Sequence, residues 1–169
     1  LARASVIDVS NQESLETYAY NVLKPHPQLA RFYYGDLSGE FLMVFRNEDK
    51  TISTKIVNTN ENQSIIKKRD SMGAFSNIET KRTNFEPRNR PWYLGAKQSE
   101  QRYWTDMYIF FTGKRPGITA SYPAYDSAGQ FKGVFGVDIE LQKISEFLQS
   151  QSHMKQLEVF IINEKNQIV

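Results

Sequence analysis

Residues 85–93 read Phe85-Glu86-Pro87-Arg88-Asn89-Arg90-Pro91-Trp92-Tyr93 and combine two arginines, two prolines and three aromatic rings within nine residues. Each proline fixes its own φ and pushes the preceding residue toward an extended conformation, so this segment is predicted to be stiff rather than a regular helix. Arg90 lies beside these rings, and a guanidinium fork matches a carboxylate at two points. The segment therefore indicates capture of a small anion by Arg90. The alternative is that the rings belong to the core and the arginines are solvated.

The composition sets broad limits on the class of protein. A chain of 169 residues is long enough for one domain with a sizeable core, or for one domain and part of a second. Its net charge of +2 and its 40% hydrophobic content are ordinary for a globular protein, and it lacks the concentrated basic stripe of a nucleic-acid binder. It contains no cysteine, so thiolate chemistry and disulfides are excluded. No apolar run approaches the length of a membrane span.

Local patterns predict a helix followed by antiparallel strands. Ser10 and Glu13 fit a capping box at the start of a helix, and apolar residues then recur at helical spacing until Pro25. Glycine-containing turns and β-branched residues predict three successive strands at 29–34, 41–45 and 51–57. Residues 64–81 show no clear period and are left unassigned.

The second half of the chain repeats this type of pattern. A short helical turn is predicted at 92–97, and strands are predicted at 105–111, 118–125 and 131–139. In the first of these strands, alternation places Asp106, Tyr108 and Phe110 on one face. A helix is predicted at about 140–149, from apolar residues that line one side of it.

The end of the chain resembles its beginning. An apolar strand at 159–162, a polar turn and a restarting strand have the same order as residues 31–42. The chain begins with Leu1 and stops inside an apolar run, so we expect it to be part of a longer protein. The sequence predicts an N-terminal helix at 1–28, an α+β module with a five- to six-stranded antiparallel sheet at 29–150, and the start of a second module at 151–169.

Evidence for an enzyme is weak. The histidines, His26 and His153, do not have metal-binding or metalloprotease spacing, and the glycines do not form a phosphate-binding loop. Gly133 and Gly136 lie inside a strand, where glycine marks a close approach of another group. General acid–base catalysis by two carboxylates would need Asp106 and Asp138 in one pocket. No feature of the sequence specifies a reaction for them. We predict no catalytic residue, metal or cofactor.

A binding site fits the residues better. Arg90 offers a positive charge, and Asp138 offers a negative charge near the end of a strand. Aromatic rings offer flat walls with polar tips, and an ammonium also binds their faces. Such a box would hold a zwitterion, with its carboxylate toward Arg90 and its ammonium toward Asp138. In the purely structural alternative, Arg90 and Asp138 pair with each other or with the backbone in the core.

Several segments accompany residues 85–93 in a combination typical of one family. They are Trp104-Thr105-Asp106, Gly117-Ile118-Thr119-Ala120, Tyr122-Pro123-Ala124-Tyr125-Asp126 and Gly133-Val134-Phe135-Gly136-Val137-Asp138-Ile139. Together they resemble a double Cache (dCache) sensor domain, the extracytoplasmic ligand-binding region of bacterial and archaeal transmembrane receptors. The resemblance runs from the first helix to the last residue. It implies a PAS-like membrane-distal module with a long N-terminal helix, followed by the first hairpin of the proximal module.

The resemblance also implies a ligand class and a site. A subset of the family binds amino acids through a spaced signature of Tyr, Arg, Trp, Tyr, Tyr and a late Asp, and here Phe85 replaces the leading Tyr and lacks its hydroxyl. An amino acid or another small carboxylate is favoured, and an amine stays open. The site residues that the resemblance and the box together predict are Phe85, Arg90, Trp92, Tyr93, Asp106, Tyr108 and Asp138.

The resemblance further implies how the parent protein works. The chain would lie outside the cytoplasm, as a homodimer through its N-terminal helix, with membrane spans elsewhere in the protein. It would pass a signal to a cytoplasmic output, which the sequence does not identify: a histidine kinase, a nucleotide cyclase, a cyclic-dinucleotide enzyme or a chemotaxis signalling domain. The alternative function is a structural or dimerisation module without a small-molecule ligand.

Overall fold

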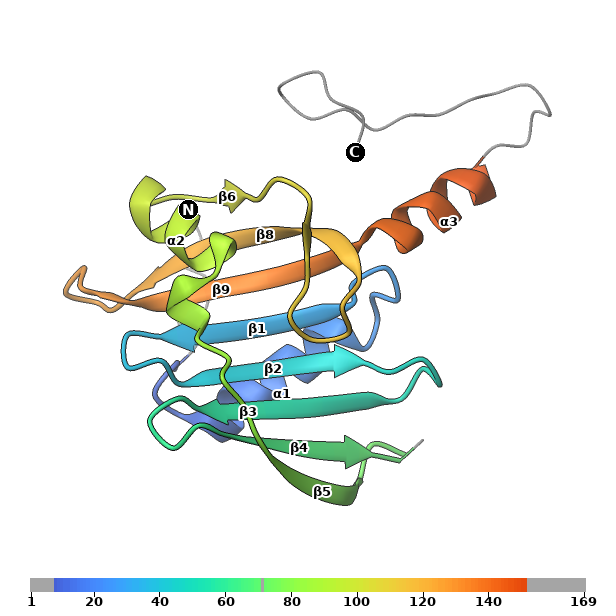
Figure 1. Ribbon diagram of the computed structural model, residues 1–169, viewed down its shortest axis with the longest axis horizontal. Coiled ribbons are helices and arrows are strands. Elements are labelled where there is room, and N and C mark those ends of the chain that lie inside the picture. The colour runs from blue at the N-terminus through green and yellow to red at the C-terminus, as the bar shows by residue number, and fades with distance from the viewer. Residues whose placement is uncertain (1–7, 71, 152–169) are drawn as a thin grey trace.

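A computed structural model describes residues 8–70 and 72–151 and shows an α+β fold built on one nine-stranded antiparallel sheet (Figure 1). The strands are β1 (Arg31–Asp36), β2 (Phe41–Arg46), β3 (Ile52–Asn58), β4 (Gln63–Arg69), β5 (Phe75–Arg82), β6 (Tyr103–Trp104), β7 (Tyr108–Ile109), β8 (Pro116–Tyr125) and β9 (Phe131–Glu140). The helices are α1 (Gln12–Leu23), α2 (Pro91–Ser99), α3 (Leu141–Gln151) and the short 3₁₀ helix η1 (Pro87–Asn89). The predicted fold class is confirmed.

The sheet is larger than predicted, with nine strands rather than five or six. Three strands were not predicted: β4 and β5, which include most of the unassigned residues 64–81, and the two-residue β6. Strand β5 is exposed along almost its whole length, so it has no buried face to impose an alternating pattern on the sequence. Strand β5 is held in the sheet by backbone hydrogen bonds, and the pattern of side chains in the sequence does not report those bonds.

The strand order brings the first and the last strand together. It runs β5-β4-β3-β2-β1-β9-β8-β6, with β7 also paired to β8. Strand β9 therefore lies beside β1, with Arg31 opposite Asp138 and Tyr33 opposite Gly136. This register is what assembles the candidate site.

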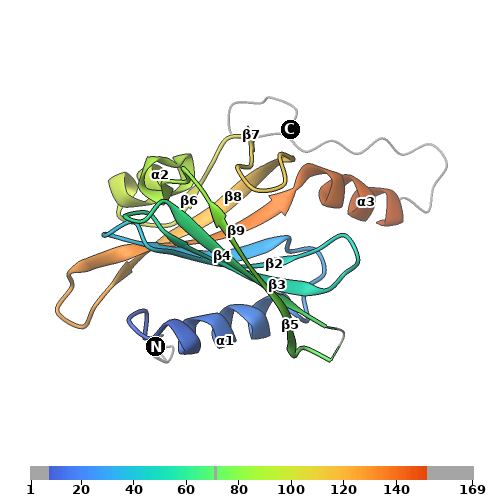
Figure 2. The ribbon, with the colours of Figure 1, turned by 60° about the horizontal axis from the view of Figure 1, so that its bottom comes forward.

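One face of the sheet is covered by α1 (Figure 2). The buried side of α1 consists of Leu15, Ala19 and Leu23, which pack against apolar side chains of β1 and β2. Two predictions for this helix were wrong. Its N-cap is Asn11, whose side chain accepts a bond of 3.0 Å from the Ser14 N–H, because Ser10 is bonded to Asp8 instead. The described helix has 12 residues and is not long.

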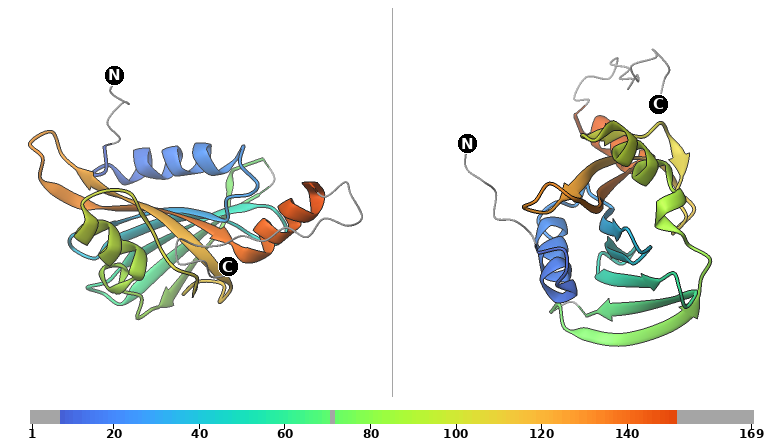
Figure 3. Two further views of the ribbon diagram at one scale, coloured as in Figure 1. Left: turned by 90° about the horizontal axis from the view of Figure 1, so that it is seen from above. Right: turned by 90° about the vertical axis from the view of Figure 1, so that its left-hand side faces the viewer.

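The opposite face is covered by η1, α2 and the segment that leads to β8 (Figure 3). The strand predicted at 105–111 was wrong as a continuous element, because only the two-residue β7 lies within it. Phe110 is buried there under the Arg31 guanidinium, at 5.0 Å from its ring centroid, whereas Asp106 is exposed, so the segment follows tertiary packing rather than a pleat.

The remaining boundaries stay predictions. Apart from Gln151, the expected second module at 151–169 lies outside the described residues, and so does most of the segment before α1. None of the helices in the described part of the chain is long and apolar enough to cross a bilayer.

Candidate functional site

The aromatic residues of the 85–93 segment lie deep in the α2 face. Trp92 and Tyr93 open the first turn of α2 and are 2% and 1% exposed, and Phe85 is 7% exposed. The Trp92 ring lies 4.8 Å from that of Tyr33, and the Tyr93 hydroxyl donates to the backbone oxygen of Asp36 at 3.0 Å. These rings therefore form much of the core on this face, whatever else they contact.

Asp138 is a buried charge on this face, at 3% exposure. Its carboxylate accepts hydrogen bonds from the Tyr33 hydroxyl at 2.6 Å and from the Thr119 hydroxyl at 2.7 Å. The guanidinium beside it belongs to Arg31, at 3.5 Å, and not to Arg90. Burial raises the pKa of Asp138 to about 6, against the lowering effect of Arg31 and the two hydroxyls.

Tyr108 and Arg90 extend this group. The Tyr108 and Thr119 hydroxyls are 2.8 Å apart, so Thr119 connects Tyr108 to Asp138. Burial and the nearby Asp138 charge raise the pKa of Tyr108 to about 12, which keeps its hydroxyl protonated at neutral pH. The Arg90 guanidinium lies 5.7 Å from the centroid of the Tyr108 ring. Although Arg90 is the N-cap of α2, its side chain makes no capping hydrogen bond.

Asp106 does not share this environment. It is exposed in the bend between β6 and β7, whereas Asp138 is buried in β9. The structure therefore gives no support to a pair of carboxylates working on one substrate. Within residues 8–70 and 72–151, no three side chains of His, Cys, Asp or Glu come close enough together to hold a metal ion.

Three further polar residues of this group, Arg31, Tyr33 and Thr119, were missed by the sequence reasoning. They surround Asp138 only because β1 and β8 flank β9, across sequence separations of 107, 105 and 19 residues. One local signal pointed to Tyr33, though not to its contact with Asp138. A Cβ on Gly136 would lie 2.1 Å from the Tyr33 ring, so the close approach predicted at this glycine is confirmed.

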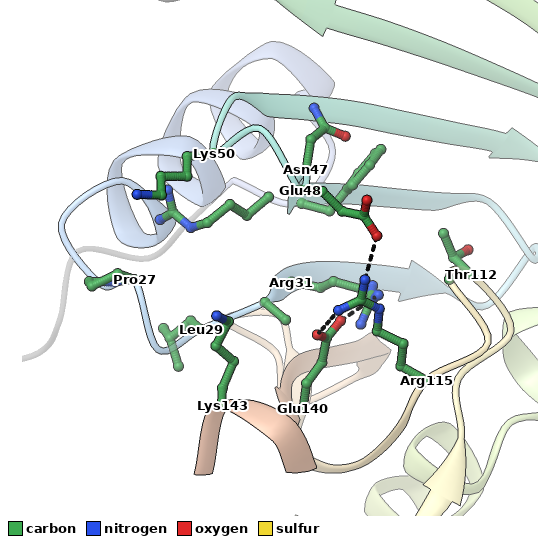
Figure 4. Close-up of a pocket in the computed structure, with 14 residues that line it drawn as sticks. Pro27, Leu29, Arg31, Asn47, Glu48, Lys50, Thr112, Arg115, Glu140 and Lys143 are labelled. Atoms are coloured by element: carbon green, nitrogen blue, oxygen red, sulfur yellow. Dashed lines mark hydrogen bonds and ion pairs between the residues drawn. The ribbon is translucent and has the colours of Figure 1, made fainter. Parts of the chain in front are cut away.

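Alternating charges lead from Asp138 to the surface; we call Asp138, Arg31, Glu140, Arg115 and Glu48 the charged row. Arg31 binds Glu140 at 3.0 Å, and Arg115 binds both Glu140 at 3.4 Å and Glu48 at 2.5 Å. The outer part of the row borders a cavity of about 470 Å³ at the end of the sheet next to α3 (Figure 4). These guanidiniums are already paired with carboxylates. We therefore regard the cavity as the place where the charged row reaches the surface, and not as a separate anion-binding site.

Comparison with known proteins places the chain in context. Residues 43–146 match the model of the family described as methyl-accepting chemotaxis protein-like, first PDC sensor domain. No curated protein is significantly similar in sequence.

Solved structures of chemoreceptor ligand-binding domains share the fold. The domain of Pseudomonas fluorescens CtaA with L-serine has a TM-score of 0.62 and 22% identity, over 95% of this chain and 55% of that one. The domain of Pseudomonas aeruginosa PctC with GABA has a TM-score of 0.60 and 17% identity, over 95% and 57%. The domain of Campylobacter jejuni Tlp3 with L-valine has a TM-score of 0.56 and 20% identity, over 94% and 52%. The chain spans about half the length of these structures.

Proposed function

We propose, from the premise that this chain belongs to the family of first PDC sensor domains of methyl-accepting chemotaxis protein-like receptors, that it binds an amino acid or another small carboxylate outside the cytoplasm. Binding shifts the module between two conformations and so passes a signal toward the cytoplasm. A ligand does this only by binding one conformation more tightly than the other. The family favours a chemotaxis output over a histidine kinase, a nucleotide cyclase or a cyclic-dinucleotide enzyme, for which the comparisons offer nothing.

The observation that carries the proposal is the connected group on the α2 face. Asp138 is buried and bonded to Thr119, Thr119 contacts Tyr108, and the Arg90 guanidinium lies over the Tyr108 ring. Asp138 is thus connected through Thr119 to the Tyr108 hydroxyl, and a positive group lies over the ring of the same tyrosine. In the proposed complex, the ligand ammonium binds near Asp138 and the ligand carboxylate binds Arg90.

The ligands named for the similar structures support this class. L-serine, GABA and L-valine all carry an amine and a carboxylate. Since those proteins share at most 22% identity with this chain, they support the type of ligand and not its identity.

The test is thermal unfolding of the purified chain in the presence of amino acids, small carboxylates and amines. A ligand at a hundred times its dissociation constant stabilises the folded state by about 2.7 kcal/mol. For a chain of this length, that free energy raises the melting temperature by about 5–10 °C. We expect a hit that contains both an ammonium and a carboxylate.

Substitution of Arg90 then tests the site. Arg90→Ala should weaken binding of the hit by about 2–5 kcal/mol, because a desolvated carboxylate loses its partner. Arg88→Ala is the matched control, since Arg88 lies in the same segment and is partly exposed and paired with Glu86 at 2.7 Å. Undiminished binding by a folded Arg90→Ala variant would place the site elsewhere.

A structural module remains the second candidate, and the observation that favours it is the near-complete burial of Trp92 and Tyr93. It predicts that no small molecule shifts the melting temperature. If this module dimerises through α1, the exposed side of the helix must form the contact, because Leu15, Ala19 and Leu23 face their own sheet. Replacement of the exposed Thr17 and Asn21 of α1 by arginine would then abolish the dimer in sedimentation experiments.

A further inference from the structure

The α2 face contains a second buried cation, Lys55 of β3, at 7% exposure. Its ammonium lies 5.6 Å from the centroid of the Phe85 ring and 5.7 Å from that of Phe111. It donates a hydrogen bond of 3.3 Å to the Thr112 hydroxyl, on the segment that covers this face. Lys55 therefore lies between the sheet and the segment that covers this face of it.

The charge of Lys55 is not balanced. Among the described residues, the ion pairs do not include Lys55, and no carboxylate offsets the burial that lowers the pKa of its ammonium. An ammonium has three donors, and in the described part of the chain one of them is used, by Thr112. A buried charge without a partner is costly, and a methionine would fill the same space without that cost.

The neighbours of Lys55 connect it to the proposed site. Across the sheet, Lys55 lies opposite Met43, Met43 opposite Tyr33, and Tyr33 opposite Gly136. The Cα atoms of Lys55 and Tyr33 are thus two strand spacings apart, roughly 10 Å. Tyr33 in turn donates to Asp138. Lys55 and Asp138 therefore lie on the same face of the sheet.

The Lys55 ammonium lies over the Phe85 ring, which offers a cation the face of its π system but no negative charge. The ring therefore leaves the charge of Lys55 unbalanced.

We propose that Lys55 binds a second carboxylate of the ligand, and that the ligand is an acidic amino acid. This inference rests on the proposed function. The ammonium of the ligand lies near Asp138, one carboxylate lies at Arg90, and the side-chain carboxylate lies at Lys55. A neutral amino acid leaves the Lys55 charge unbalanced and binds more weakly.

The experiment is calorimetric titration of the chain with L-glutamate and L-aspartate and with their amides, L-glutamine and L-asparagine. We expect the acids to bind more tightly than the amides. Lys55→Met should reduce affinity for the acids about 30-fold or more, the effect of losing one partner of a buried charge pair, and leave affinity for the amides within a few-fold. Lys55→Arg should retain the preference for acids.

Two controls separate binding from structure. Lys114→Met removes a cation whose ammonium lies 4.6 Å from the same Phe111 ring, but Lys114 is exposed, so this variant should keep the wild-type preference. Thr112→Val removes the hydrogen bond between Lys55 and Thr112 and keeps the charge of Lys55, so it too should still prefer acids. In the absence of ligand, Lys55→Met should melt at a higher temperature than wild type, which a purely structural lysine would not do.

The outcomes distinguish this inference from the proposed function. A wild type that binds the amides or aliphatic amino acids as tightly as the acids would overturn the role of Lys55 and leave the proposed function intact. The same holds if Lys55→Met keeps the wild-type ratio between acid and amide. If no amino acid or carboxylate binds at all, both proposals fail.

Discussion

Asp138 is held in an environment that favours its protonated form. Burial raises its pKa to about 6 in the folded chain, from the 3.8 of an unperturbed carboxyl. The folded state thus binds this proton more tightly than the unfolded state, and stability is lost as pH rises through the folded pKa. The shift corresponds to about 3 kcal/mol.

We therefore predict that Asp138→Asn flattens the pH dependence of stability. Between pH 4 and pH 8, the free energy of unfolding of the wild type should fall by about 3 kcal/mol more than that of the variant, since an amide does not ionise. Chemical denaturation at a series of pH values measures this difference. Parallel curves for the two proteins would show that Asp138 does not titrate in this range.

At the level of elements, α1 is fastened to the sheet by a buried polar group as well as by its apolar side. Glu16 of α1 is 6% exposed and accepts bonds from Arg69 at 2.5 Å, Thr54 at 2.7 Å and Lys67 at 3.1 Å. Arg69 is itself 9% exposed. Loss of Glu16 would therefore leave a buried guanidinium without its carboxylate.

Glu16→Gln should destabilise the chain by about 3–5 kcal/mol, the usual effect of removing one partner of a buried ion pair. Glu13→Gln is the control, because Glu13 lies on the same helix one turn earlier and is exposed. Urea denaturation of the two variants measures the difference. Equal stabilities would mean that Glu16 contributes no more than a surface charge.

The elements that could be predicted from the sequence are those with a buried side and a clear period. They include α1, β1 to β3, β8 and β9, and glycine turns mark the connections from β1 to β2 and from β8 to β9. Strand β5 was missed because it is almost fully exposed, and residues 105–111 were wrongly predicted because Phe110 packs on Arg31 rather than following a pleat. The spacing of apolar residues predicts an element only where one side of that element is buried. The prediction therefore fails where the element is exposed, or where its burial depends on residues far away in the sequence.

The same limit applies to the candidate site. Arg90, Tyr108 and Asp138 were predicted from the family signature, which assigns positions directly. Arg31 and Tyr33 carry no local sign of contact with Asp138, because that contact depends on the pairing of β1 with β9. Lys55 was missed for the same reason, since its burial depends on a covering segment more than fifty residues away.

For the molecule as a whole, the sheet separates two cores, with α1 on one face and the proposed site on the other (Figure 2). We predict that ligand slows amide hydrogen exchange in residues 105–115 and in β9, and leaves α1 nearly unchanged. The covering segment has few regular backbone hydrogen bonds and gains order from a ligand beneath it, whereas α1 lies across the sheet. Hydrogen exchange followed by mass spectrometry tests this prediction. Protection confined to α1 would contradict it and place the ligand on the α1 face of the sheet.

The charged row contains three carboxylates and two guanidiniums, so it lacks one positive charge. The raised pKa of Asp138 fits this deficit, because a proton is one way to make up the missing charge. The ammonium of a bound ligand is another. Either cation would leave Arg31 freer to favour Glu140, the residue that immediately precedes α3. Because the row has an odd number of charges, one added positive charge at the site changes the ion pairing of Arg31 and Glu140. The effect reaches the first residues of α3, a helix that the ligand does not contact.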